Sequence, residues 1–236
     1  TKKVGKTTLA LQWFANLAQT ETAAFISLEM GRGPVKRKLM QQRCGQWRTP
    51  ELNQAELYEK PLPLKEWEAA LAELDSWTGA VIFEPKGTER TCEYICGWIE
   101  DRHRTAPCSA YFIDYAQLLK SEHGNQFRSN RVQELEYISG MLKDTATTTG
   151  APIVLLAQSA DQKATDSMEI EVKGCRTFEQ DCGLMVAIAR KDYVFNAAIR
   201  ANRFGQSDIE VKLNWNRKHV LFEEALRLEH GKWVEA

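Results

Sequence analysis

The sequence lacks the features of a membrane protein or of a repeat protein. No apolar run approaches the roughly 18 uninterrupted residues that a membrane-spanning helix needs, and no signal peptide is recognisable. Internal repeats and low-complexity linkers are missing as well. These absences exclude an integral membrane protein and predict a globular chain that does not act at a membrane.

Neither charge nor cysteine is concentrated. The chain has 31 basic and 32 acidic residues, so it has no global basic field that would attract nucleic acid. Any nucleic-acid contact must therefore be local, or be created by several subunits together. Of the six cysteines only Cys92 and Cys96 lie one helical turn apart, without the second pair or histidine cluster of a metal site. We expect buried, reduced thiols, which fit the cytoplasm.

Apolar periodicity predicts an alternation of helices and strands over the first two thirds of the chain. The predicted helices cover 8–19, 35–43, 64–74, 92–99 and 132–142. The predicted strands cover 23–27, 80–84, 109–113 and 153–157. This order is typical of an α/β fold with a mainly parallel central sheet and helices on its faces.

The last third has a different pattern. We expect a long mobile loop over 161–178, a buried strand over 184–189, and an antiparallel hairpin over 208–222, where apolar and polar residues alternate. The 236 residues suit one core, so a single domain over 1–236 is predicted.

The chain opens with Val4-Gly5-Lys6-Thr7-Thr8, the closing half of a phosphate-binding loop. Backbone N–H groups at the helix start would point at a polyphosphate, Lys6 would reach its β and γ phosphates, and the Thr7 hydroxyl would ligate Mg²⁺. The first glycine of the full pattern would stand one residue before Thr1, so we expect a piece of a longer chain. Without further residues, a solvated turn entering an amphipathic helix explains the tripeptide equally well.

Polar residues recur where the predicted strands end. Glu29, Asp114 and Gln158 each follow an apolar run, and ligands of open parallel sheets bind at the carboxyl ends of the strands. Each alone would be an ordinary loop residue or helix cap, but together with Gly5-Lys6-Thr7 they favour an ATP and Mg²⁺ site. Glu29 is then the candidate for activating the attacking water. Arg203 is a candidate for stabilising the transition state, although it also fits an ordinary surface arginine.

These segments resemble the C-terminal RecA-like motor domain of DnaB-type replicative helicases. The matching segments are Ile26-Ser27-Leu28-Glu29-Met30, Ile113-Asp114-Tyr115-Ala116-Gln117-Leu118, Leu156-Ala157-Gln158-Ser159 and Phe178-Glu179-Gln180-Asp181. The resemblance implies a RecA-like P-loop NTPase fold, with Glu29 as catalytic base and Asp114 as the carboxylate that organises Mg²⁺. It also implies that Gln158 senses the γ-phosphate and the state of the DNA, and that Arg203 is the arginine finger given to the adjacent subunit's ATP.

The resemblance further implies a homo-oligomeric ring, a hexamer, that hydrolyses ATP between subunits and moves on single-stranded DNA, with primase and a helicase loader as partners. Two departures suggest a divergent member, as from a phage or mobile element. Ala201 stands where the family has a lysine near its finger, and Cys182-Gly183 stands where it has Ala-Asp. Arg200 would point to the opposite face of a strand from Arg203. Inter-subunit activation would then rest on one cation or on a lysine elsewhere.

DNA contacts are expected in two loops, 121–131 and 160–178, which match the DNA-contacting loops of the family. Their cations are Arg128, Arg131, Lys163, Lys173 and Arg176. Sparse cations repeated around a ring can bind a phosphate backbone without reading bases. Simple solvated loops would have the same composition.

Two rival functions share the same ATP chemistry. A RecA- or RadA-like recombinase would form filaments for strand exchange, and a KaiC-like ATP switch would bind protein partners without unwinding DNA. The Ser-Leu-Glu-Met and Ile-Asp-Tyr-Ala-Gln matches argue against the recombinase. The nucleotide-site residues do not separate the helicase from the switch.

Overall fold

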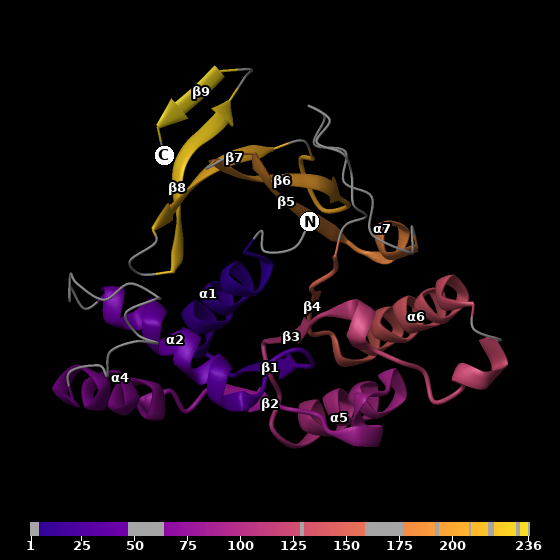
Figure 1. The fold of residues 1–236 in the computed structure, drawn as a ribbon. Coiled ribbons are helices and arrows are strands. Elements are labelled where there is room, and N and C mark those ends of the chain that lie inside the picture. Colours follow the sequence, from indigo (N-terminus) through magenta and orange to yellow (C-terminus); the bar gives the residue numbers. More distant parts are fainter. Residues whose placement is uncertain are drawn as a thin grey trace.

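The chain folds into two β-sheets with helices around the first (Figure 1). The computed structural model describes residues 5–46, 64–127, 130–158, 177–191, 194–207, 209–216, 220–229 and 232–235. One sheet is parallel with the strand order β2-β1-β3-β4, and the other is antiparallel with the order β5-β6-β7-β8-β9.

The parallel sheet consists of β1 (Ala23–Ser27), β2 (Ala80–Phe83), β3 (Ala110–Asp114) and β4 (Ile153–Leu155). The antiparallel sheet consists of β5 (Leu184–Lys191), β6 (Val194–Asn202), β7 (Glu210–Asn216), β8 (Leu221–Glu229) and β9 (Lys232–Glu235). The α-helices are α1 (Lys6–Ala18), α2 (Arg32–Gln46), α4 (Leu64–Ser76), α5 (Cys92–Thr105), α6 (Arg131–Thr149) and α7 (Thr177–Asp181). Short 3₁₀ turns are η1 (Gly87–Arg90), η2 (Ala116–Leu118) and η3 (Gly124–Phe127).

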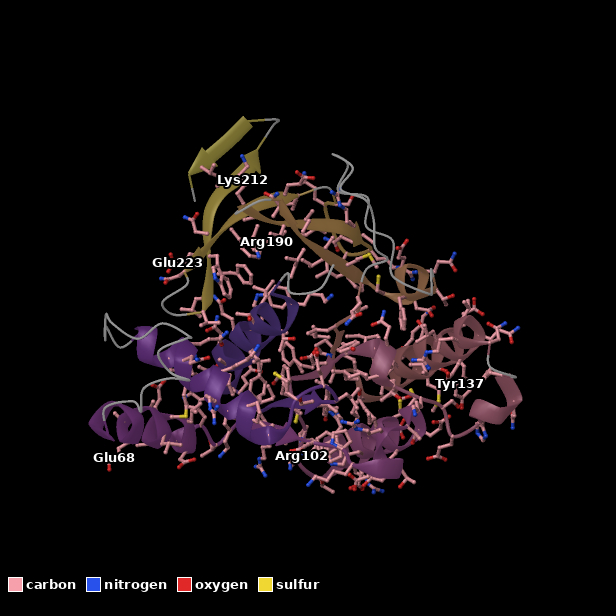
Figure 2. The ribbon with its side chains drawn as sticks, viewed as in Figure 1. Glu68, Arg102, Tyr137, Arg190, Lys212 and Glu223 are labelled. Atoms are coloured by element: carbon pink, nitrogen blue, oxygen red, sulfur yellow. The ribbon has the colours of Figure 1, made fainter. Side chains whose placement is uncertain are left out.

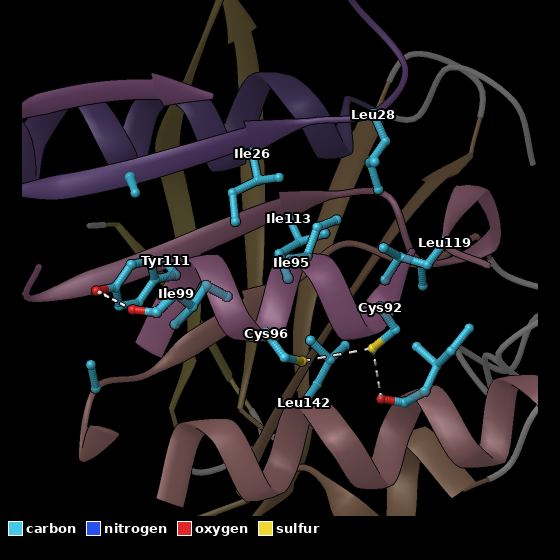
Figure 3. Close-up of a cluster of buried hydrophobic side chains, with 14 of the residues drawn as sticks. Ile26, Leu28, Cys92, Ile95, Cys96, Ile99, Tyr111, Ile113, Leu119 and Leu142 are labelled. Atoms are coloured by element: carbon cyan, nitrogen blue, oxygen red, sulfur yellow. Dashed lines mark hydrogen bonds between the residues drawn. The ribbon is translucent and has the colours of Figure 1, made fainter. Parts of the chain in front are cut away.

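Helices cover both faces of the parallel sheet because its strands send successive side chains to opposite sides. Ile26 and Ile113 face α5 and α6, in the core shown in Figure 3. Phe25 and Phe112 face α1, α2 and α4. In Figure 2 the labelled Arg102 and Tyr137 come from the α5–α6 layer, Glu68 from α4, and Arg190, Lys212 and Glu223 from the antiparallel sheet.

The antiparallel sheet packs against the first turns of α1. Leu9 meets Phe195 and Phe222 in a third apolar cluster. Gln12 adds a reciprocal pair of hydrogen bonds, because its amide donates to the Phe222 carbonyl at 2.9 Å and accepts from the Phe222 N–H at 3.1 Å. The second sheet therefore fixes the helix that follows the glycine turn at residue 5.

Most predicted elements through residue 157 are confirmed, as is the parallel sheet. The hairpin is confirmed as β7–β8, but β6 and β9 were missed, so the sheet has more strands than predicted. Helix α2 begins before Pro34, which sits in the first turn, where a missing N–H breaks no helical hydrogen bond. Thr177 and Phe178 open α7, and the rest of the predicted loop lies outside the described residues.

The strand at 184–189 is not fully buried as predicted, since Leu184 is 52% exposed. Within the described ranges β5 pairs with β6 alone, and its other edge borders a cavity of about 800 Å³ that β4 and α1 also line. Cys92, Cys96 and Cys108 are buried free thiols, as expected. None of the described helices has the length and apolarity that crossing a bilayer requires.

Gly79 tests the close packing beside β1. A Cβ atom there would lie 1.9 Å from the carbonyl oxygen of Glu21, a backbone atom that cannot move aside. We expect Gly79→Ala to lower the free energy of unfolding by about 2 kcal/mol or more. Gly97→Ala, in the middle of α5 with nothing within 4 Å, should instead raise it by roughly 0.5–1 kcal/mol. Chemical denaturation of both variants measures the contrast, and equal effects would contradict the packing.

Candidate functional site

Two predicted site residues meet at the carboxyl edge of the parallel sheet. Strands β1 and β3 are in register, with Ser27 opposite Asp114, and the N–H of Leu28 donates to the Asp114 carbonyl at 2.9 Å. Asp114 is the last residue of β3 and is 2% exposed, whereas Glu29 lies two residues past β1 and is exposed. The register thus brings a buried and an exposed carboxylate to one edge.

The glycine turn delivers the start of α1 to the same edge. Gly5 has a φ of 86°, in the left-handed region, and a Cβ atom on it would lie 2.4 Å from the Phe222 ring. Both facts call for glycine. Lys6 and Thr7 follow in the first helical turn, and the Thr7 side chain hydrogen-bonds to Asp114. The N–H groups of this turn are available to an anion.

The carboxyl of Asp114 is held in an unusual state. Burial raises its pKa to about 6, and the negative charge of Glu29 adds to the increase. The hydrogen bond from Thr7 and the charges of Lys38 and Lys6 act in the opposite direction. Its Oδ2 atom is buried with no hydrogen-bond partner in the structure. A buried acceptor without a partner is costly unless a ligand satisfies it.

Lys38 is a site residue that sequence reasoning missed. It lies on α2, and its pKa is lowered by burial against the opposing attraction of Asp114 and Glu29, as is the pKa of Lys6. One helical turn later the buried Gln42 donates to the Thr8 carbonyl at 2.9 Å, so this face of α2 is turned toward the start of α1. Two lysines therefore flank the same two carboxylates. The basic character of the predicted helix at 35–43 was the available signal, but no motif marked this lysine.

The residues at this edge fit Mg²⁺ and a polyphosphate. A hydroxyl and a carboxylate with an unsatisfied oxygen are ligands of the kind that Mg²⁺ takes, directly or through water. Lys6 and the helix start supply positive charge for phosphate oxygens. Groups of three or more His, Cys, Asp or Glu able to hold a metal are absent from the described part of the chain, so the phosphates would have to supply further ligands.

Gln158 belongs to the same cluster through Tyr115. Its side chain hydrogen-bonds to Tyr115, and the pKa of that tyrosine is raised by burial and by the charges of Glu29 and Asp114. The backbone of Gln158 is paired with Gln117, whose amide donates to the Gln158 carbonyl at 3.2 Å and accepts from its N–H at 3.1 Å. The structure therefore brings together four predicted side chains, those of Lys6, Thr7, Asp114 and Gln158, with Glu29 at the rim.

Arg203 lies elsewhere. It follows β6, donates a side-chain hydrogen bond to the carbonyl of Gln180, and its N–H donates to the Gly183 carbonyl at 2.8 Å. Burial raises the pKa of the Cys182 thiol, and the charge of Arg203 opposes that increase. The neighbouring Arg200 is paired with Glu210 on the next strand, at 3.1 Å.

Of the predicted DNA-contacting cations, only Arg131 falls in the described ranges. Its guanidinium donates to the carbonyls of Gln117 and Leu119 at 3.1 and 2.7 Å and pairs with Glu134 at 2.5 Å. It is thus engaged within the chain. The other predicted positions outside the described residues are Val4, Arg128, Lys163, Lys173 and Arg176. Thr8 is buried and faces Gln42 through its carbonyl.

A model of the family "DnaB-like helicase C terminal domain" matches residues 2–224. The chain belongs to this family. It is 24% identical over 196 residues to the replicative DNA helicase DnaC of Bacillus subtilis and 26% identical to the replicative DNA helicase DnaB of Geobacillus stearothermophilus. Each match covers 80% of this chain but only 41% of the relative, so the chain spans less than half the length of these helicases.

Solved structures of the DnaB-like family share the fold. A solved ATPase domain matches with a TM-score of 0.78 and 20% identity, over 94% of this chain and 81% of that one. A DnaB-like replicative helicase studied with primase matches at 0.79 and 20% identity, over 94% of this chain and 55% of that one. The RadB recombinase is less similar, with a TM-score of 0.57 and 17% identity over 93% and 86% of the two chains. The RecA-like fold is therefore confirmed.

The raised pKa of Asp114 predicts a pH-dependent stability. An acid with a higher pKa in the folded state lowers the free energy of unfolding as pH rises from about 4 to 6, and the penalty is complete above that range. Without ligand, Asp114→Asn should therefore raise the melting temperature at pH 7.5 by a few degrees. At pH 4.5, where most Asp114 is protonated, the gain should be much smaller.

Thermal unfolding of both proteins at the two pH values measures this difference. Asp101→Asn, on the surface of α5, is the control, and it should give the same small change at both pH values. A loss of stability in Asp114→Asn at pH 7.5 would contradict the assigned electrostatics.

Proposed function

We propose that this chain is the ATP-driven motor domain of a replicative DNA helicase. It binds Mg·ATP at the carboxyl edge of the parallel sheet and assembles with other copies into a ring, a hexamer. ATP hydrolysed between subunits drives movement on single-stranded DNA, which separates the strands of a duplex. Family membership and the likeness to DnaB-like ATPase domains support this proposal.

The observation that carries the proposal is the buried carboxylate of Asp114 beside Lys6 and Thr7. Keeping a carboxylate away from water, with one oxygen unpaired and two lysines close by, weakens the fold and is typical of a binding or catalytic site. A structural ion pair would satisfy both oxygens. A ligand that brings its own cation and anionic oxygens satisfies them all.

Each residue then has a defined part in phosphoryl transfer. Lys6 binds the β and γ phosphates, while Thr7 and Asp114 hold the magnesium, directly or through water. When bound, Mg²⁺ neutralises charge on the phosphate oxygens. Glu29 accepts the proton of the attacking water, a role that suits its exposed position next to the buried site. Gln158 senses the γ-phosphate from the next strand end.

Arg203 acts on the neighbouring subunit's nucleotide. Its contacts in this chain are with residues 180–183, and the charged groups that perturb Asp114 are Glu29, Lys38 and Lys6. A cation exposed away from its own phosphate site suits donation in trans. Each active site would thus be shared by two subunits.

A KaiC-like ATP switch stays the alternative, because it would use the same phosphate site without moving on DNA. A recombinase fits less well, since RadB matches the fold less closely than the DnaB-like structures do. For the helicase we also propose single-stranded DNA contacts in the loops 121–131 and 160–178, partnership with primase and a loader, a cytoplasmic location, and a single motor domain over 1–236. The solved DnaB-like helicase, described with its interactions with primase, supports the choice of primase.

ATP hydrolysis stimulated by single-stranded DNA tests the helicase against the switch. We expect the full-length protein to hydrolyse ATP faster with single-stranded DNA and to unwind a forked duplex. Lys6→Ala should weaken ATP binding and abolish both activities, while Lys36→Ala, on the other face of α2 from Lys38, should retain them. Hydrolysis that DNA does not stimulate, with no unwinding, would overturn the helicase in favour of the switch.

Mixing two inactive variants tests whether Arg203 acts in trans. Arg203→Ala should bind ATP normally but not hydrolyse it, and Lys6→Ala should fail at the phosphate. In mixed rings an Arg203→Ala subunit keeps its Lys6 and can receive Arg203 from a Lys6→Ala neighbour. Steady-state ATPase assays of the mixture should therefore recover part of the wild-type rate. A mixture as inactive as its components would place Arg203 in its own subunit's site, and an active Arg203→Ala protein would remove its role altogether.

A further inference from the structure

The side chain of Gln117 completes a rung that the backbone leaves open between β3 and β4. The last pair of the ladder is Ile113 with Leu155. Beyond it the Leu156 N–H donates to the Ile113 carbonyl at 3.0 Å, and the Ala116 N–H donates to the Leu156 carbonyl at 2.8 Å. The chain after β3 then turns into η2 and its backbone can no longer run beside β4.

The Gln117 amide takes over at this point. It offers a donor and an acceptor to the carbonyl and N–H of one residue, Gln158, at 3.2 and 3.1 Å. An amide side chain has the same donor and acceptor pair as a peptide group, so it extends the pairing by one residue. The backbone of Gln158 is thereby fixed although it lies past the end of β4.

The turn that carries Gln117 is itself anchored to α6. Arg131, the first residue of that helix, donates to the carbonyls of Gln117 and Leu119. Glu134 pairs with Arg131 and accepts from the Ser121 N–H at 2.8 Å. Gln117 therefore stands on a supported turn, and the position of Gln158 depends on it.

We propose that Gln117 is a positioning residue for Gln158 in the hydrolysis of ATP. It does not touch the nucleotide. It sets the point from which the Gln158 side chain starts, so that this side chain stays against Tyr115, next to Asp114. The inference rests on the proposed ATPase function and adds to it a residue outside the phosphate-binding set.

The expected effect is a loss of rate without a loss of binding. A displaced side chain in an active site costs up to roughly a hundredfold in rate, and we expect Gln117→Ala to lower kcat by roughly tenfold. The affinity for ATP should stay unchanged, because Lys6 and Thr7 bind it. Gln117→Met should behave alike, since it keeps the length of the side chain and loses only the hydrogen bonds.

A double-mutant cycle separates positioning from general support of the fold. In a Gln158→Ala background, Gln117→Ala should have no further effect on kcat, because nothing remains to be positioned. Gln12→Ala is a matched control, since Gln12 makes the same reciprocal pair with the Phe222 backbone on the other side of the molecule. It should lower the melting temperature as Gln117→Ala does and leave kcat unchanged.

The assay is steady-state hydrolysis by the full-length protein, with nucleotide affinity and melting temperature measured alongside. An unchanged kcat in Gln117→Ala and Gln117→Met overturns the inference, as does an effect that adds in full to that of Gln158→Ala. A kcat that falls equally in Gln12→Ala would assign the loss to stability and also overturn it. A wild-type protein that does not hydrolyse ATP would instead overturn the proposed function, and the inference with it.

Discussion

The buried carboxylate of Asp114 is the charge on which the candidate site depends. It lies at the end of a central strand, with a raised pKa and one oxygen that has no partner. Lys6 and Lys38 lower the cost of this buried charge without removing it. A site held ready in this way binds a cation and anionic oxygens without having to rearrange, at the expense of the stability of the empty protein.

The rest of the fold serves to bring groups to that carboxylate. Parallel pairing of β1 with β3 places Glu29 at the same edge, and pairing of β3 with β4 continues through Gln117 to Gln158. The antiparallel sheet acts from the other side, because Phe222 packs on Gly5 and so fixes the start of α1. Arg203, at the far end of β6, is left to serve another subunit.

The sequence predicts the parts of this design that follow local rules. Helical and strand periodicities locate most elements up to residue 157, and polar residues at strand ends identify Glu29, Asp114 and Gln158. Features that depend on tertiary contacts escape it. Nothing local marks Lys38, which reaches the carboxylates only because Gln42 orients α2. Strand β6 has Ala197 and Ala198 at its centre and lacks clear alternation, so its pairing with β5 was not visible.

The central claim is that two subunits share one ATP site, and a structure of the full-length protein on single-stranded DNA with a transition-state analogue of ATP tests it most directly. The account predicts that the analogue lies between Lys6 and Gln158 of one subunit, and that Arg203 of the next subunit has left Gln180 to contact the γ-phosphate position. An analogue bound with every Arg203 still held by Gln180 of its own chain would contradict it.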